Sequence, residues 1–377
     1  MSSKKYIPVL GLIASVIAVQ VIASALEREF YLTQLTMSAY YTLVILGLTV
    51  LMGYAGQISL GHAAFFAMGG YTTAVLTTYN LAASAGNPLA KLAADIGLST
   101  VSSNAYGVRI EHLSPWAALV VAAALTAGVA FLIGIPILKL KGHYLAMATL
   151  GFGIIVYRIV LGSRIFGEAD GISDLPPFRI AGGLTVSGDP ALRVQNYYIA
   201  AFLILAGIII LNNLVDSRVG RALRSIRGSE EAANTMGVNT ARYKLFIFVI
   251  SAVFACIAGV FLTHFNGGIG PSEADVMKSV SYVAIVAVGG MANLWGALVM
   301  GIVLNYLSLR GYFGSYDELV FGGILIVIML FFPDGLLRSE NFQLKGIIEK
   351  MKRIKHNYTA ISRKVAQSLR YIDKKDK

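Results

Sequence analysis

Three polar side chains lie close together inside an apolar stretch of the sequence: Gln57, Ser59 and His62. Three glycines surround them, at positions 53, 56 and 61. Glycine accepts backbone conformations that interrupt a helix, and among lipid an irregular backbone is tolerated only where it lines a cavity or is buried by protein. The freed amides and carbonyls could contact a passing zwitterion, so these three residues are candidates for a solute pathway. The alternative for His62 is a histidine whose nitrogens are satisfied by a neighbouring helix.

Asn293 is a fourth pathway candidate, because it lies in another apolar stretch that is interrupted by Gly289-Gly290 and by residues 293 to 296. The competing interpretation of Asn293 is a simple turn residue.

Residues 216 to 244 have the pattern of a structured loop, not of a linker. Asp216 or Ser217 can cap a first short helix. Its apolar face consists of Val219, Leu223 and Ile226, and another face consists of Arg221, Arg224 and Arg227 at threefold spacing. Gly228 is expected to end this helix in a left-handed conformation.

A second short helix is predicted directly after the first. Ser229 can cap it, and Glu230 and Glu231 fall in its first turn, where negative charge is favourable. Gly237 is expected to end it. Two capped amphipathic helices in one loop predict a surface that a partner holds. The alternative is an ordinary basic loop whose caps arise by chance.

Several kinds of chemistry are disfavoured. The sequence has no G-x-x-x-x-G-K-S/T phosphate loop and no H-E-x-x-H pair, so neither ATP hydrolysis by that device nor a zinc protease is expected. The five histidines are too scattered for a recognisable metal site, and Cys256 is the single cysteine. We therefore predict no catalytic residues and no metal site. No Asp or Glu lies centrally in an apolar run, which argues against a proton symporter; a sodium site made of carbonyls would escape this test.

The composition indicates a helical membrane protein. Of the 377 residues 56% are hydrophobic and 14% charged, whereas about a quarter are charged in a soluble chain. Residues 338 to 377 hold 12 basic and 4 acidic residues, so this tail supplies +8 of the net charge of +11. A basic flank beside a span favours contact with anionic lipid over binding of nucleic acid. The alternative is a disordered, solvated tail.

Runs of about 20 apolar residues predict the membrane spans. They lie at 7–25, 31–52, 60–79, 116–138, 197–215 and 244–263, with shorter runs at 143–160 and 318–332 and an interrupted one at 279–309. The first run also resembles a secretory signal, but it is longer than usual for one. Segments 80–115 and 161–196 are polar and are expected outside.

Basic residues are enriched in cytoplasmic loops, so we place both termini and the 216–244 loop in the cytoplasm. This orientation requires 279–309 to break into two spans or a re-entrant pair near 291–296. The predicted fold is an all-α polytopic membrane protein of about ten segments, with a transmembrane domain at 1–337 and a basic cytoplasmic tail at 338–377.

The second helix contains Glu231, Ala232, Ala233 and Gly237 in the pattern E-A-A-x-x-x-G, which resembles the coupling loop of ABC importer permeases. The stretches GYAGQISLGHAAFFAMGGY, LKLKGHYLAMATLGFG, RVGRALRSIRGSEEAANTMGVN and FFPDGLL look like signatures of the M-type membrane subunit of branched-chain amino acid ABC transporters. The resemblance covers roughly residues 31 to 337. Two places depart from the family pattern, at 166–168 and 291–293, and they weaken any statement about the substrate.

The resemblance implies an inner-membrane, multi-pass transport subunit of a prokaryote that forms half of a pathway for branched-chain amino acids. It implies a homologous second permease, two ATPase subunits that use ATP and Mg, and an external substrate-binding protein. It also implies that the arginine face at 221, 224 and 227, with Glu231, Ala232, Ala233 and Gly237, couples to the ATPases. Rival interpretations are a permease for urea, short amides or sugars, and a secondary carrier or channel without an ATPase.

Overall fold

A computed structural model describes residues 7–79, 99–103, 109–180 and 183–312, together with positions 316, 319–320, 322–324 and 326–327. The predicted span at 318–332 lies mostly outside these residues. The FFPDGLL motif and the predicted basic tail at 338–377 lie wholly outside them.

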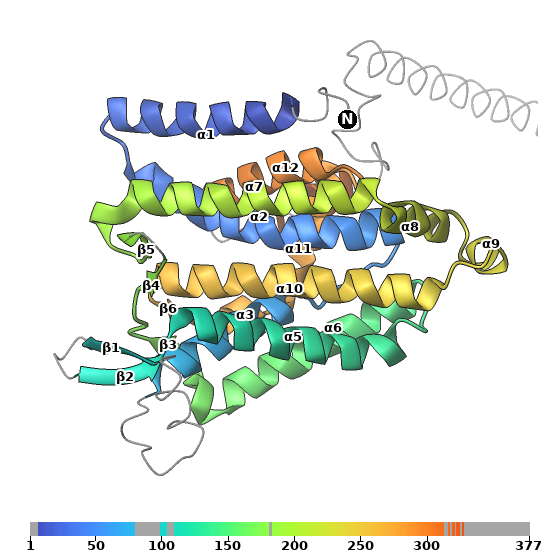
Figure 1. The fold of residues 1–377 in the computed structure, drawn as a ribbon, viewed down its shortest axis with the longest axis horizontal. Helices are drawn as coiled ribbons and strands as arrows, with labels where there is room; N and C mark the ends of the chain where they lie inside the picture. Colours follow the sequence, from blue (N-terminus) through green and yellow to red (C-terminus); the bar gives the residue numbers. More distant parts are fainter. Residues whose placement is uncertain are drawn as a thin grey trace, which may run out of the picture.

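Six helices in the described part are long and apolar enough to cross a membrane. They are α1 (Ile7–Ala25), α2 (Phe30–Ala55), α5 (Pro115–Ile137), α6 (His143–Gly162), α7 (Arg193–Asp216) and α10 (Thr240–Asn266). Three shorter helices complete the bundle: α3 (His62–Thr78), α11 (Val276–Gly289) and α12 (Leu294–Leu309) (Figure 1). The protein is therefore a polytopic helical membrane protein, as the composition predicts.

The core is built around α2, α3 and α10. The apolar window of α2 is 89% buried, whereas that of α1 is 11% buried, so α1 lies at the periphery beside α7 (Figure 1). Close approach of α3 and α10 depends on glycine, because a Cβ at Gly259 would overlap the carbonyl oxygen of Phe66 and one at Gly69 that of Cys256. Small residues allow such contacts where no hydrophobic effect drives helices together.

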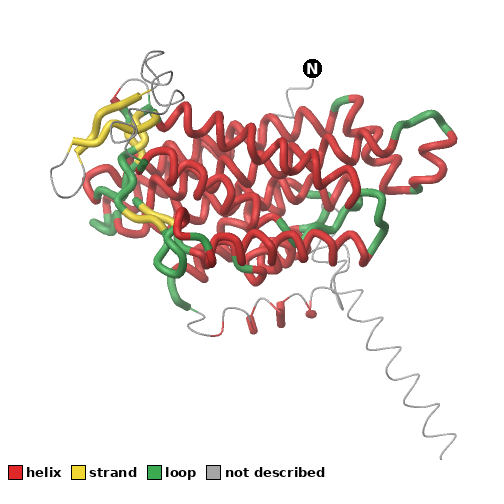
Figure 2. The backbone as a smooth tube through the Cα atoms, turned by 90° about the horizontal axis from the view of Figure 1, so that it is seen from below, coloured by secondary structure: helices red, strands yellow, loops and turns green. Residues whose placement is uncertain are grey.

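The bundle has two different ends (Figures 1 and 2). One, here called the strand end, carries three two-stranded antiparallel sheets. They pair β1 (Ser99–Ser103) with β2 (Arg109–Leu113), β3 (Ile172–Ser173) with β6 (Gly268–Ile269), and β4 (Phe178–Arg179) with β5 (Thr185–Val186). The other, called the loop end, carries α8 (Arg218–Gly228) and α9 (Glu230–Thr235). The described parts of 80–115 and 161–196 thus gather at the end opposite the 216–244 loop.

Two long helices are each followed by an irregular segment that turns back into the bundle. After α2 the chain is irregular from 56 to 61, and α3 then begins beside Ser251, the twelfth of the 27 residues of α10. After α10 comes β6 and the 3₁₀ turn η6 (Pro271–Ala274), which lies beside Tyr41, the twelfth of the 26 residues of α2. The two units run in opposite directions, and both half-helices, α3 and α11, begin near the middle of the bundle.

The predicted break in 279–309 is confirmed. Helices α11 and α12 are separated by residues 290 to 293, where Gly290 has φ 98°. The turn rests on the loop end of α2, because Tyr54 Oη donates to the carbonyl of Ala292 at 2.8 Å and a Cβ at Gly53 would overlap the carbonyl of Met291. Helices of 14 and 16 residues are only about 21 and 24 Å long.

Candidate functional site

The irregular segment after α2 brings Ser59 and His62 together. His62 is fully buried at the start of α3, and its Nδ1 lies 3.1 Å from Ser59 Oγ. Its Nε2 lies 2.7 Å from Ser251 Oγ on α10. The interruption predicted from the glycines is therefore present, and both histidine nitrogens have hydroxyl partners. These contacts fix the start of α3 against the middle of α10.

Backbone amides of the same segment are held by hydroxyls from other helices. Leu60 N donates to Thr149 Oγ1 of α6 at 2.9 Å, and Ala63 N donates to Ser279 Oγ of α11 at 3.0 Å. The second of these bonds joins the first turns of α3 and α11. The two half-helices thus meet through their N-terminal ends.

Gln57 differs from its two neighbours. Its side chain is buried, with 3% of the residue exposed, yet neither the amide oxygen nor the amide nitrogen has a hydrogen-bond partner among the described residues. Burying an unpaired amide costs about 1–3 kcal/mol by mutational data. Such a group indicates water or a ligand that the folded chain alone does not supply.

Asn293 has a local role. Its Oδ1 accepts from Gly296 N at 3.1 Å, which caps α12. The structure brings it to the turn on the loop end of α2, and not to the Ser59–His62 cluster. The geometry of Asn293 therefore fits the interpretation as a turn residue.

A charged cluster near the middle of the bundle escaped the sequence reasoning. Glu273 Oε1 accepts from Tyr41 Oη at 2.8 Å and from Lys278 Nζ at 3.3 Å, and Lys278 Nζ also donates to Tyr41 Oη at 3.2 Å. Glu273 lies between two apolar runs in the sequence, but the fold places it against the twelfth residue of α2. The argument from acid-free runs against a proton carrier therefore loses its force. The signal available in the sequence was the stretch PSEADVMK beside an apolar run.

At the loop end, α8 forms largely as predicted. Ser217 Oγ accepts from Val219 N at 3.1 Å, and the apolar face turns inward, with Leu223 and Ile226 buried. The prediction for Gly228 is wrong: it is the last residue of α8 and is not left-handed. An extended Ser229, with φ −159° and ψ 113°, redirects the chain instead.

The arginines at 221, 224 and 227 of α8 do not act alike, although all three are exposed. Arg227 reaches back to the bundle, where its Nη1 donates to the carbonyl of Gly53 at the end of α2. Arg227 therefore joins the loop to the segment that carries Gln57 and His62.

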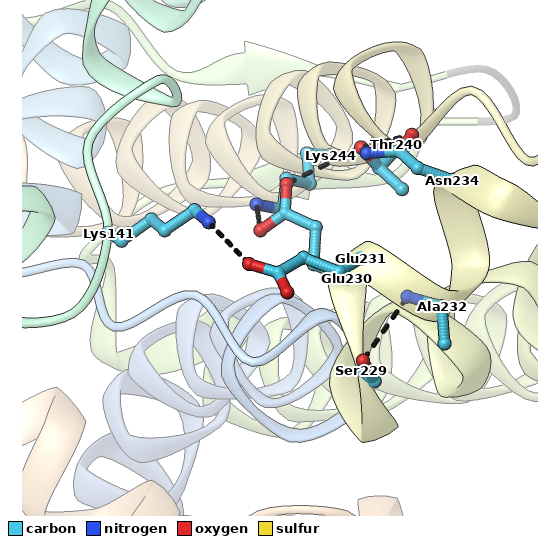
Figure 3. A network of polar contacts seen from close by, with 8 residues as sticks. All are labelled: Lys141, Ser229, Glu230, Glu231, Ala232, Asn234, Thr240 and Lys244. Carbon is cyan, nitrogen blue, oxygen red and sulfur yellow. Dashed lines mark hydrogen bonds and ion pairs between the residues drawn. The ribbon is translucent and has the colours of Figure 1, made fainter.

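Helix α9 forms as predicted and contains two neighbouring acids with different surroundings (Figure 3). Ser229 Oγ accepts from Ala232 N at 3.2 Å, which caps the helix. Glu230 Oε2 lies 2.5 Å from Lys244 Nζ at the start of α10, and these side chains are 28% and 9% exposed. Glu231 lies 3.7 Å from Lys141 Nζ, with 88% and 69% of the side chains exposed. Glu230 anchors the loop, whereas Glu231 faces solvent.

The small residues of α9 are divided in the same way. Ala233 is buried against the loop, and Ala232 is exposed. Gly237 ends the helix with φ 83°, as predicted. The exposed side of α9 thus includes the small side chain of Ala232 beside the exposed carboxylate of Glu231.

The described residues contain no group of three or more His, Cys, Asp or Glu side chains placed to hold a metal ion. The arrangement therefore offers polar contacts near the middle of an apolar bundle and a rigid charged loop at one end. Such an arrangement is suited to binding a small solute inside the bundle and to contacting a partner protein at the loop end.

Comparison with known proteins identifies the family. The family model described as branched-chain amino acid transport system / permease component matches residues 30–329. LivM, the high-affinity branched-chain amino acid transport system permease protein of Salmonella typhimurium, is 33% identical over 82% of this chain and 70% of its own length. LivM of Escherichia coli is 32% identical over the same shares, and LivH of Escherichia coli is 24% identical over 80% of this chain and 92% of its own length. No solved structure matches the chain at a significant level.

Proposed function

The chain belongs to the family of permease components of branched-chain amino acid transport systems, and we propose that it forms half of the translocation pathway of an ATP-driven importer. Its permease partner is a second, homologous subunit. LivM and LivH of one organism are both similar to this chain, which supports a pair of related but different permeases. Two ATPase subunits use ATP and Mg, and an external binding protein delivers a branched-chain amino acid.

The observation that carries this proposal is the shape of the loop end. Helix α9 is capped by Ser229, anchored by the Glu230–Lys244 pair and exposes Glu231 beyond the bundle (Figures 1 and 3). A short rigid helix with an exposed acid suits a groove on an ATPase. Arg221 and Arg224 add positive charge on the exposed side of α8, and Arg227 passes movement of the loop to the end of α2.

The topology follows from this assignment. The loop end is cytoplasmic, because its segment from 216 to 244 carries the excess of arginine and lysine expected inside. The strand end then faces the binding protein. With the α11–α12 hairpin and a last span near 318–332, the permease domain at 1–337 has about ten segments and both termini inside, and residues 338–377 form a basic tail on the inner face.

The pathway segment in this proposal is the irregular stretch from 56 to 61. Gln57 is its strongest contributor, because its buried amide lacks a partner. Ser59 and His62 shape the segment through their mutual contact and the bond to Ser251. Asn293 contributes by holding the α11–α12 turn against α2.

Replacement of Glu231 tests the coupling assignment. In proteoliposomes that contain the intact complex and its binding protein, Glu231→Leu should abolish ATP-dependent uptake of leucine while the chain still inserts and assembles. Lys141→Gln is the matched control, since it removes the exposed ion pair of Glu231 without changing α9. Its uptake should remain near normal, because exposed pairs contribute about 0–1 kcal/mol. Normal uptake by Glu231→Leu would overturn the assignment.

The same preparation separates the rival functions. Uptake of leucine that continues with the permeases alone and without ATP would identify a secondary carrier or channel. Uptake of urea, short amides or sugars in place of leucine would leave the permease family intact and change the substrate.

A further inference from the structure

A pocket with both polar and apolar side chains in its lining opens between α2, η6, α11 and α12, and none of residues 57 to 62 lines it. Its volume is about 370 Å³, at the small end of the range for pockets that bind small molecules. The lining consists of Tyr41, Ser272, Asp275, Met277, Lys278, Ser281, Tyr282, Asn305, Ser308 and Leu309. Acid, base, hydroxyl, amide and apolar groups thus surround one small space.

The pocket places charged side chains inside an apolar bundle, where they need an explanation. Tyr41 is the twelfth of the 26 residues of α2 and Leu309 is the last residue of α12, so the pocket extends from the end of α12 toward the middle of the bundle. Charged side chains at such a depth are costly and face a water-filled cavity or another protein chain. The cation and acids here therefore do not face lipid.

Glu273 and Tyr41 hold the ammonium of Lys278 in place. Glu273 is 16% exposed and does not line the pocket, and its Oε1 accepts from Lys278 Nζ and from Tyr41 Oη. The Lys278 ammonium also lies 4.5 Å from the centre of the Tyr41 ring. An ammonium has three donor protons. Two bonds from Lys278 Nζ go to Glu273 and Tyr41, which leaves one donor for a further acceptor.

A polar atom without a partner gives a second, independent indication of a ligand. Tyr282 lines the pocket and is 1% exposed, and its hydroxyl has no hydrogen-bond partner among the described residues. An unpaired buried polar group costs free energy, so its presence indicates a missing partner.

We propose that this pocket is a binding site for a zwitterionic α-amino acid with an apolar side chain. The substrate carboxylate binds Lys278 Nζ and the Tyr282 hydroxyl, and its ammonium binds the carboxylate of Asp275. The apolar side chain contacts Met277, Leu309 and the Tyr41 ring. Glu273 is a positioning residue that aims Lys278. This inference rests on the proposed function and adds a substrate-reading site to it.

A cysteine scan provides a direct binding test. The single native cysteine, Cys256, is buried, so the parent chain should not react with a small water-soluble maleimide. In the intact complex Ser281→Cys should react, and L-leucine should slow its reaction, whereas 4-methylpentanoate and isopentylamine, which each lack one charge, should protect far less. Ala169→Cys, in an exposed turn of the strand end, should react without protection by leucine.

Transport kinetics provide the second test. Lys278→Met should raise the KM for leucine by about tenfold or more, the effect of losing one charged hydrogen bond. Lys139→Met, at an exposed lysine between α5 and α6, is the matched control and should keep the KM. Glu273→Gln should give a smaller rise, since it leaves the ammonium in place.

The outcomes separate the two proposals. Suppose that the wild-type complex imports leucine. Three results would then overturn the pocket proposal and leave the importer assignment intact: Ser281→Cys does not react, leucine does not protect it, or Lys278→Met keeps the KM for leucine. A wild-type complex that imports no branched-chain amino acid would overturn the proposed function itself.

Discussion

Glutamates 230 and 231 are neighbours in α9, yet the structure predicts a large loss of stability when Glu230 is replaced and almost none when Glu231 is replaced. Glu230→Gln leaves the ammonium of Lys244 with 9% of its side chain exposed and without its carboxylate partner at 2.5 Å. Breaking a fully buried pair costs about 3–5 kcal/mol. Because 28% of Glu230 is exposed, water can replace part of the lost contact, and we expect about 2 kcal/mol. This corresponds to an opening of α9 that is about 30-fold more frequent.

Hydrogen exchange of the amides from 232 to 238 in the purified complex measures this opening, because exchange reports local unfolding. Glu230→Gln should speed their exchange about 30-fold. Glu231→Gln should change it less than about twofold, since its partner Lys141 is exposed. The double variant Glu230→Gln/Lys244→Met should recover most of the protection, because it removes both charges. Equal exchange in the two single variants, or no recovery in the double variant, would refute the reasoning.

Three further predictions concern the bundle. Gln57→Leu should leave the thermal stability of the complex unchanged or raised while uptake falls, because the buried amide of Gln57 has no partner to lose among the described residues. His62→Ala should lower stability by about 2–4 kcal/mol, because it loses two hydroxyl contacts and leaves a cavity. Thermal unfolding and uptake measured on both variants test this. Gly259→Ala should destabilise the protein by about 1–3 kcal/mol through overlap with α3, whereas Gly128→Ala, which meets nothing within 4 Å, should not; the two melting temperatures should differ accordingly. Asn293→Ala should cost about 1 kcal/mol through loss of the α12 cap and leave the KM for leucine unchanged, which uptake assays check.

The candidate site was partly foreseeable. Glycines at 53, 56 and 61 predicted the irregular segment, and the polar residues between them identified Gln57, Ser59 and His62. The contact from His62 to Ser251 could not be foreseen, because it joins residues 189 positions apart. The cluster of Tyr41, Glu273 and Lys278 was missed for the same reason, since Tyr41 and Glu273 lie 232 positions apart.

The sequence by itself determined the local features of this protein. Run lengths predicted most of the long apolar helices, although the run at 60–79 forms only the 17-residue α3 and the shorter run at 143–160 forms the long helix α6. The serines at 217 and 229 and the glycine at 237 predicted the caps of α8 and α9. Hydropathy and capping depend on residues within one or two turns, so one chain segment contains the whole signal.

The tertiary structure decided which side chains are exposed to a partner or a solute and which hold the fold together. It partly buried Glu230 and exposed Glu231, joined Arg227 to the carbonyl of Gly53, and brought Glu273 to the middle of α2. Each of these outcomes depends on distance through space between separate helices. Burial and charge pairing are properties of such distances, and spacing along the chain does not contain them.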